Sequence, residues 1–129
     1  MGGLVYDSGA LVAAAHGQAE VWRLHRGALE RSVTPLVIAP VLASAFGRAP
    51  GEGLLAAFLR GCAVVDFPVA AAYDAGRLLA RSGTTDAAAA AVVLAAVATR
   101  SAVVTADPDQ VRALAGALGV ELPLAAVSA

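Results

Sequence analysis

Four aspartates are the residues of this sequence with the clearest capacity for chemistry. Asp7 directly follows the apolar run "LVY", and Asp107 and Asp109 come just after the run "AVVT". Asp86 opens the Ala-rich segment before that second run. Each also has a purely structural explanation, because aspartate is a preferred N-cap and first-turn residue of helices. The pattern therefore predicts either separate helix starts or one acidic site.

An acidic site would have a definite chemistry. Carboxylates gathered in one place repel one another unless some are protonated or a cation neutralises them. Oxygen ligands without an accompanying Cys or His constellation suit Mg²⁺ or Mn²⁺ better than Zn²⁺. A divalent ion held in this way can polarise a phosphoryl oxygen and activate water for attack on a phosphodiester. Such a site would perform nuclease chemistry.

Short β-branched runs alternate with longer Ala- and Leu-rich segments along the whole chain. We expect strands over residues 3–7, 35–39, 62–67 and 101–107, and an edge strand within 120–127. We expect helices over residues 8–16, 18–31, 40–46, 54–60, 68–81, 85–99 and 108–118. This alternation predicts a single α/β domain over residues 1–129, with a mainly parallel sheet covered by helices on both faces.

That architecture gives the aspartates a common location. Ligand sites of open α/β sheets lie beyond the carboxyl ends of the strands, where the strand order reverses. Asp7 closes the first strand and Asp107 the fourth, so the two carboxylates converge if those strands are neighbours. Asp86 and Asp109 are candidates for the same pocket. Arg48, beside the Gly-rich loop 47–53, is the candidate for binding a substrate phosphate.

Composition excludes several classes of protein. Of the 129 residues 59% are hydrophobic and the formal net charge is -1, which argues against disorder and against a strongly basic nucleic-acid binder. All nine basic residues are Arg. Receiver domains, haloacid-dehalogenase-type phosphatases and P-loop proteins use a Lys, so the chain does not fit those classes.

The sequence also bears on location and partners. The longest apolar stretch, 87–98, is shorter than the ~20 residues of a membrane-spanning helix. The first residues lack a positively charged region and include Asp7, which argues against a signal peptide. With the single Cys62, these features predict a soluble, cytoplasmic protein. The abundance of apolar residues predicts an exposed patch that binds a second copy, as a homodimer, or a helix of another protein.

Three segments together resemble the PIN-domain family, in particular actinobacterial members similar to VapC toxins of toxin-antitoxin systems. They are "LVYDSGALVAA", "VTPLVIAPVLASAFGR" and "GTTDAAAAAVVLAAVATRSAVVTADPDQVRALA". The resemblance covers nearly the whole chain. It implies a three-layer α/β/α PIN-like fold, a Mg²⁺- or Mn²⁺-dependent endoribonuclease activity, an RNA substrate and an antitoxin partner that inserts a segment near the acidic site.

The family's acidic residues are only partly present. Asp7 matches its first metal-site aspartate, and Asp107 and Asp109 match its last acidic pair, so the resemblance implies that these three hold the metal. Ser44 stands where the family usually has a Glu, and Ala89 where it usually has an Asp. Asp86 lies one helical turn before Ala89 and is a possible fourth catalytic carboxylate.

These two departures leave three explanations open. The chain is an active nuclease that uses Asp86, or a natural degenerate member kept for binding, or a copy in which Ala89 was introduced to inactivate a toxic protein. The expected function is RNA cleavage by Asp7, Asp86, Asp107 and Asp109, with a catalytically degenerate module that binds a protein partner as the alternative.

Overall fold

The computed structural model describes residues 3–128. The strands are β1 (Leu4–Tyr6), β2 (Leu36–Ile38), β3 (Ala63–Val65), β4 (Ala102–Thr105) and β5 (Leu124–Ala126). The helices are α1 (Ser8–Ala15), α2 (Ala19–Glu30), α3 (Ala39–Phe46), α4 (Gly53–Leu59), α5 (Val69–Ser82), α6 (Ala87–Thr99) and α7 (Pro108–Ala117). Each predicted element is confirmed, with ends that agree within two residues apart from the later start of β5.

The five strands form one sheet in the order β3-β2-β1-β4-β5, and every pairing in it is parallel. The chain builds the sheet outward from β1 to β3 and then returns to place β4 on the other side of β1. This reversal lies between β1 and β4, which run in register from Leu4 opposite Ala102 to Tyr6 opposite Val104. The first and fourth strands are therefore neighbours, which was the condition for Asp7 and Asp107 to converge.

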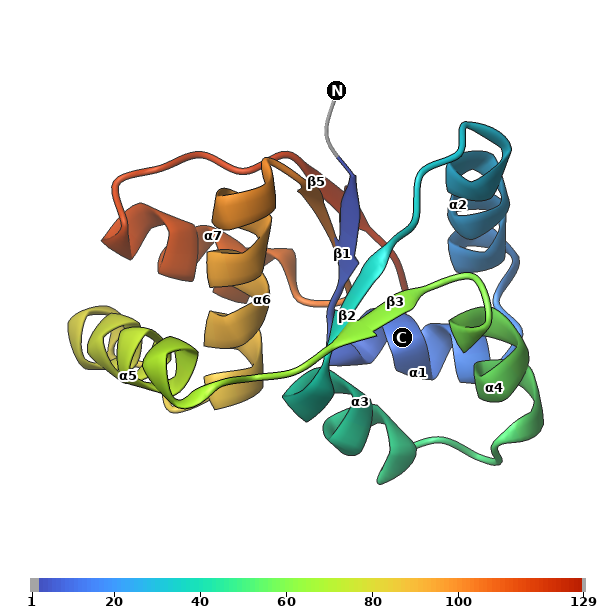
Figure 1. Ribbon diagram of the computed structural model, residues 1–129, viewed down its shortest axis with the longest axis horizontal. Helices are drawn as coiled ribbons and strands as arrows, with labels where there is room; N and C mark the ends of the chain where they lie inside the picture. The colour runs from blue at the N-terminus through green and yellow to red at the C-terminus, as the bar shows by residue number, and fades with distance from the viewer. Residues whose placement is uncertain (1–2, 129) are drawn as a thin grey trace.

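Helices cover both faces of the sheet and produce three layers. Figure 1 shows α5, α6 and α7 on one side of the strands and α1, α2 and α4 on the other. Helix α3 lies at the carboxyl edge, where it contacts both α1 and α6. No single helix in the described part of the chain is long and apolar enough to cross a membrane, and the consecutive helices α5 and α6 reach that length only together, bent by 108°.

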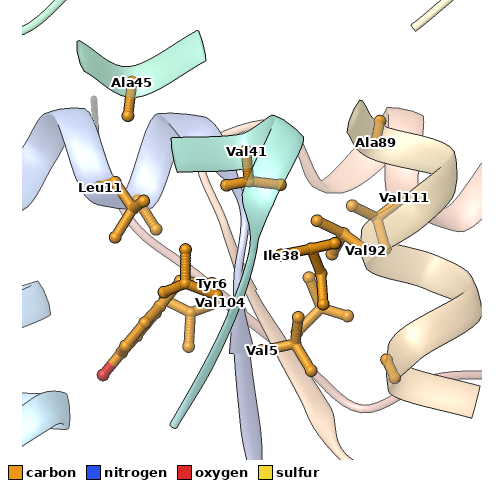
Figure 2. Packing of buried hydrophobic residues seen from close by; sticks show 14 of the residues in the cluster. Val5, Tyr6, Leu11, Ile38, Val41, Ala45, Ala89, Val92, Val104 and Val111 are labelled. Atoms are coloured by element: carbon orange, nitrogen blue, oxygen red, sulfur yellow. The ribbon is translucent and has the colours of Figure 1, made fainter. Parts of the chain in front are cut away.

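Successive residues of β1 contribute to the two halves of the core, one on each face of the sheet. Val5 and Tyr6 are both fully buried, and successive side chains of a strand point to opposite faces. Figure 2 shows Val5 beside Ile38 and Val92 on the α6 side, whereas Tyr6 lies toward Leu11 of α1. Burial on both faces explains why the central strand β1 is apolar at every position.

A polar contact lies inside the α1 side of the core. His25 of α2 is only 4% exposed, and its Nδ1 atom is 2.9 Å from the Tyr6 hydroxyl. Its ring stacks on Phe58 of α4 with a centroid separation of 3.9 Å. Burial lowers the pKa of His25, although a hydrogen bond to the Phe58 backbone opposes the shift. The residue is a neutral core histidine that joins β1, α2 and α4.

Helix α1 approaches the end of β4 so closely that one position requires glycine. A Cβ atom at Gly9 would lie 2.5 Å from the Cβ of Ala106. Real atoms do not approach so closely, so a side chain there would push α1 away from the turn that follows β4. Gly9 therefore fixes the spacing between the start of α1 and the turn that leads from β4 into α7.

We expect Gly9→Ala to lower the free energy of unfolding by about 1–3 kcal/mol, the usual cost of overpacking a tight contact. Gly116→Ala is the matched control, because a Cβ at Gly116 of α7 meets no described atom within 4 Å. It should instead raise stability by on the order of 0.5 kcal/mol through helix propensity. Urea unfolding measures both, and equal effects of the two substitutions would contradict the tight contact.

A second prediction concerns pH. Because the native pKa of His25 lies below its unfolded value, the unfolded chain takes up a proton first as the pH falls below about 6.5. The free energy of unfolding should therefore decrease from about pH 7 toward the lowered native pKa. His25→Asn should remove part of this slope. Urea unfolding at several pH values tests this, and an unchanged slope in His25→Asn would contradict it.

Candidate functional site

A hollow of about 350 Å³ opens at the carboxyl edge of β1 and β4. Its lining includes four residues that the sequence predicted for the site and several that it did not. The lining residues are Asp7, Ser8, Gly9, Ser44, Arg48, Asp86, Ala106, Asp107 and Gln110. Hollows of similar or larger size lie against α5 and α7, but their linings are mainly apolar residues. Three of the four candidate aspartates and Arg48 lie around this hollow.

Asp7 lies deepest in this group. Its backbone N–H donates to the Val104 carbonyl of β4 at 3.0 Å, and its Oδ1 atom accepts from the Ala10 N–H at 2.8 Å as the N-cap of α1. Burial raises the pKa of the Asp7 carboxyl, and the negative charge of Asp107 raises it further. Hydrogen bonds from the Thr105 hydroxyl and from the N–H groups of Ala10 and Ala106 oppose that rise. Asp7 and Asp107 line the same hollow.

Asp86 and Asp107 enter the hollow as the N-caps of two further helices. Asp86 Oδ1 accepts from the Ala89 N–H at 3.0 Å at the start of α6. Asp107 Oδ1 accepts from the Gln110 N–H at 3.2 Å at the start of α7. A carboxylate has two oxygens with about four acceptor sites in all, so a capping aspartate keeps acceptor capacity for a ligand. The structural and chemical explanations of these aspartates are therefore compatible.

The structure does not bring Asp109 into the hollow. Its side chain is 97% exposed and pairs with Arg112 at 3.4 Å on the surface of α7. Residues two apart on a helix point in different directions, so Asp109 cannot follow Asp107 toward β1. The metal-ligand and catalytic roles expected for Asp109 from the sequence have no support from its position, which is that of an ordinary first-turn acid.

Arg48 reaches the hollow from the loop after α3. Its Nη2 atom donates to the Ser8 hydroxyl at 2.8 Å, a contact across 40 positions of the sequence. The guanidinium is thereby held beside the first helix start, one residue from Asp7. Arginine presents several N–H donors in a planar fork that matches a phosphate group. Arg48, the residue expected from the sequence to bind a substrate phosphate, thus lies in the lining of the hollow together with Asp7.

The two positions at which the resemblance leads us to expect an acid lie differently with respect to the hollow. Ser44 of α3 is part of its lining, so a Glu at that position would have added a fourth carboxylate. Ala89 is buried in the first turn of α6, and its N–H binds Asp86. Ser8 and Gln110 were missed by sequence reasoning, because one serine after a strand and one glutamine in a helix carry no distinctive pattern.

Within residues 3–128, no three His, Cys, Asp or Glu side chains come close enough to form a metal-binding cluster. Each aspartate of the hollow uses one oxygen to cap its own helix. Three carboxylates against one guanidinium nevertheless leave an excess of negative charge around the hollow. The arrangement can attract a cation and, through Arg48, a phosphate group.

Replacing the buried carboxylate should stabilise the fold. Because the native pKa of Asp7 is raised, its charged form is disfavoured in the native state at neutral pH. Asp7→Asn keeps the oxygen that caps α1 and removes the charge, so we expect a higher free energy of unfolding at pH 7 and a smaller difference as the pH falls through the raised pKa. Asp109→Asn, at a solvent-exposed position, is the control and should bring no such gain. Urea unfolding of the two variants that showed the same change would refute this effect of burial.

Comparisons with known proteins support the fold. No protein-family model and no curated protein matches the sequence. The crystal structure of VapBC2 from Rickettsia felis bound to a DNA fragment from their promoter contains a chain that matches with a TM-score of 0.69 and 17% identity, over 95% of this chain and 97% of that one. PAE2754 from Pyrobaculum aerophilum matches with a TM-score of 0.64 and 16% identity, over 95% of this chain and 82% of the other. The chain therefore has a three-layer α/β/α PIN-like fold.

Proposed function

We propose that this protein is a Mg²⁺- or Mn²⁺-dependent endoribonuclease of toxin-antitoxin type. The observation that supports the proposal is the meeting of Asp7, Asp86 and Asp107 with Arg48 around one hollow, at the switch point of a parallel sheet. Ligand sites of such sheets lie at this point. A combination of acidic residues and one oriented arginine suits a phosphodiester better than a neutral substrate.

The donor set fits one class of metal site. All the acidic ligands of the hollow are oxygen donors, which suits Mg²⁺ and Mn²⁺. A closed cage of protein ligands is not formed by the described residues, but Mg²⁺ is commonly held by one or two carboxylates together with waters and substrate phosphates. Asp7 and Asp107 would hold the ion, with Asp86 as the further carboxylate. The bound ion would polarise a phosphoryl oxygen and activate water.

The residues of the chain would divide the remaining work. Arg48 would bind the phosphate by its guanidinium, and the Ser8 hydroxyl would keep that guanidinium oriented. Asp7, whose backbone is tied to β4, would supply a carboxylate at a fixed position. Ser44 would contribute a neutral hydroxyl to the wall. Because a hydroxyl does not replace a negative charge, we expect weaker metal binding than a fourth carboxylate would give.

The biological setting is part of the proposal. The fold is shared with a chain of the VapBC2 structure, and that assembly was crystallised with promoter DNA. We infer that this chain likewise has a protein antitoxin as partner and that its substrate is RNA. The small net charge of -1 implies that RNA is bound at the hollow and its rim rather than over a wide basic surface.

A second candidate function follows from the two replaced acids. Ser44 and Ala89 remove two carboxylates from the pattern, and the three that remain do not form a metal cluster in the described residues. A catalytically degenerate module that retains the fold and binds a protein partner fits these observations. Ala89 as an introduced, inactivating replacement is a third explanation, because an aspartate there would lie in the first turn of α6, three residues after Asp86.

Metal binding and RNA cleavage distinguish these functions. We expect calorimetry to show Mn²⁺ binding that Asp7→Asn weakens by at least about tenfold, the range seen for loss of even an outer-shell partner. Ala89→Asp should strengthen binding, because it adds a carboxylate near Asp86. Cleavage of an RNA mixture should follow the same order and stop with EDTA. Arg48→Ala should reduce cleavage while leaving Mn²⁺ binding intact.

The matched control is Glu121→Gln, which removes one acid from the segment before β5, at the amino edge of the sheet. It should alter neither measurement. Mn²⁺ binding without cleavage in the unaltered chain, together with cleavage in Ala89→Asp, would indicate a nuclease site inactivated at position 89. Absence of Mn²⁺ binding in all variants would sink the nuclease proposal and leave the binding module.

A further inference from the structure

A second polar hollow, of about 370 Å³, lies between α2 and the strands β1 and β5. Its lining comes from three distant segments of the chain and consists of Leu4, Glu20, Arg23, Leu24, Gly27, Arg31, Ala125 and Ala126. This α2 hollow shares no lining residue with the hollow at the carboxyl edge. Its charged side chains are two guanidinium groups and one carboxylate, so the balance of charge is positive, opposite to that of the acidic edge.

The two arginines of the α2 hollow have no carboxylate partner. Arg23 and Arg31 are both exposed, and they are eight residues apart, a little more than two turns of helix. Within residues 3–128 the ion pairs lie on α5 and α7, so neither arginine of α2 takes part in one. Glu20, three residues before Arg23, is not paired with it either. Two guanidinium groups are therefore free to bind an anion.

Gly27, midway between the arginines, keeps the space between them open. It lies in the interior of α2, where glycine lowers helix stability relative to alanine, and it is not one of the glycines with positive φ. A Cβ atom there would meet Arg31 Nη1 at 3.4 Å and no other of the compared described atoms within 4 Å. The Arg31 guanidinium therefore lies back along the helix over Gly27, toward Arg23. The missing side chain leaves room for an anion beside both arginines.

We propose that Arg23 and Arg31 bind the phosphate backbone of RNA in the α2 hollow, as a second contact separate from the acidic edge. The identity of the ligand as RNA rests on the proposed function. The planar fork of a guanidinium matches phosphate oxygens, and backbone contacts position a nucleic acid without reading its sequence. Two arginines form a local contact, which is compatible with the net charge of -1.

The surroundings of the arginines favour a nucleic acid over a protein segment. Protein interfaces have an apolar core, whereas nucleic-acid interfaces are polar and positively charged. The most exposed large apolar side chains of residues 3–128 lie elsewhere, on the outer face of α5, where Val69 and Tyr73 are 73% and 65% exposed. The small Ala126 of β5 is exposed and lets a strand approach the arginines closely. Glu20 repels a phosphate from its end of the hollow, so the anion binds toward Arg31.

Anisotropy of a short fluorescent single-stranded RNA, measured in EDTA, tests the contact without metal or cleavage. The double variant R23Q/R31Q should bind roughly tenfold more weakly at low salt, because each exposed charge contact is worth up to about fivefold. The slope of log K against log salt should fall by about 1.4, or about 0.7 for each lost phosphate contact. R23K/R31K keeps both charges and should retain most of the slope. Arg26→Gln, on the same helix but outside the lining, is the matched control and should leave both quantities nearly unchanged.

A blocking substitution gives a second readout. Gly27→Glu places a carboxylate between the two arginines and should weaken RNA binding about as much as R23Q/R31Q, whereas Gly27→Ala should not. Circular dichroism checks that each variant is folded. DNA of the same sequence should show the same loss, because the contact is to phosphate. Equal affinity and salt slope in the unaltered chain and R23Q/R31Q overturns the proposal, and so does binding of polyglutamate in place of RNA, which would indicate an acidic protein partner.

Steady-state kinetics separates this inference from the proposed nuclease function. In a chain that cleaves RNA, R23Q/R31Q should raise KM and leave kcat unchanged, because the contact is the same in the ground state and the transition state. RNA binding that R23Q/R31Q weakens, with no cleavage by any variant, would keep the α2 contact and reject the nuclease. Cleavage with the same KM in R23Q/R31Q would keep the nuclease and reject the α2 contact.

Discussion

The parallel pairing of β1 with β4 is the contact on which the candidate site depends. It lets the backbone of Asp7 bind Val104 at 3.0 Å and brings Asp107, one hundred positions later, to the same edge. Two helices begin immediately beyond these strands, and the tight contact at Gly9 sets their separation. If β4 paired with another strand, Asp7 would still cap α1, but Asp107 would not lie beside it.

Three of the aspartates combine two physical roles. As N-caps they satisfy N–H groups at the starts of α1, α6 and α7, which helix starts need in any fold. Burial raises the pKa of the Asp7 carboxyl, and the negative charge of Asp107 raises it further. Local helix stability and the electrostatics of the edge thus act in opposite directions. A bound cation would relieve that repulsion.

The acidic edge and the outer face of α5 use different properties of the same architecture. The edge depends on where strands end, so its residues come from many segments of the chain. The face of α5 depends on one helix whose inner side is used by α6 and α7. No residue of α5 lies in the lining of the hollow at that edge.

Much of this protein is determined by local sequence. Strand and helix positions follow from apolar runs, from aspartates at helix starts and from Pro108, all of which act over a few residues. The sequence predicted that Asp7 and Asp107 meet only on the condition that the first and fourth strands are neighbours, and the tertiary structure met that condition. Tertiary structure alone decided that Asp109 points to solvent, that Arg48 binds Ser8 and that His25 is buried against Tyr6. These outcomes depend on side-chain direction and on contacts between distant segments, which no short-range pattern encodes.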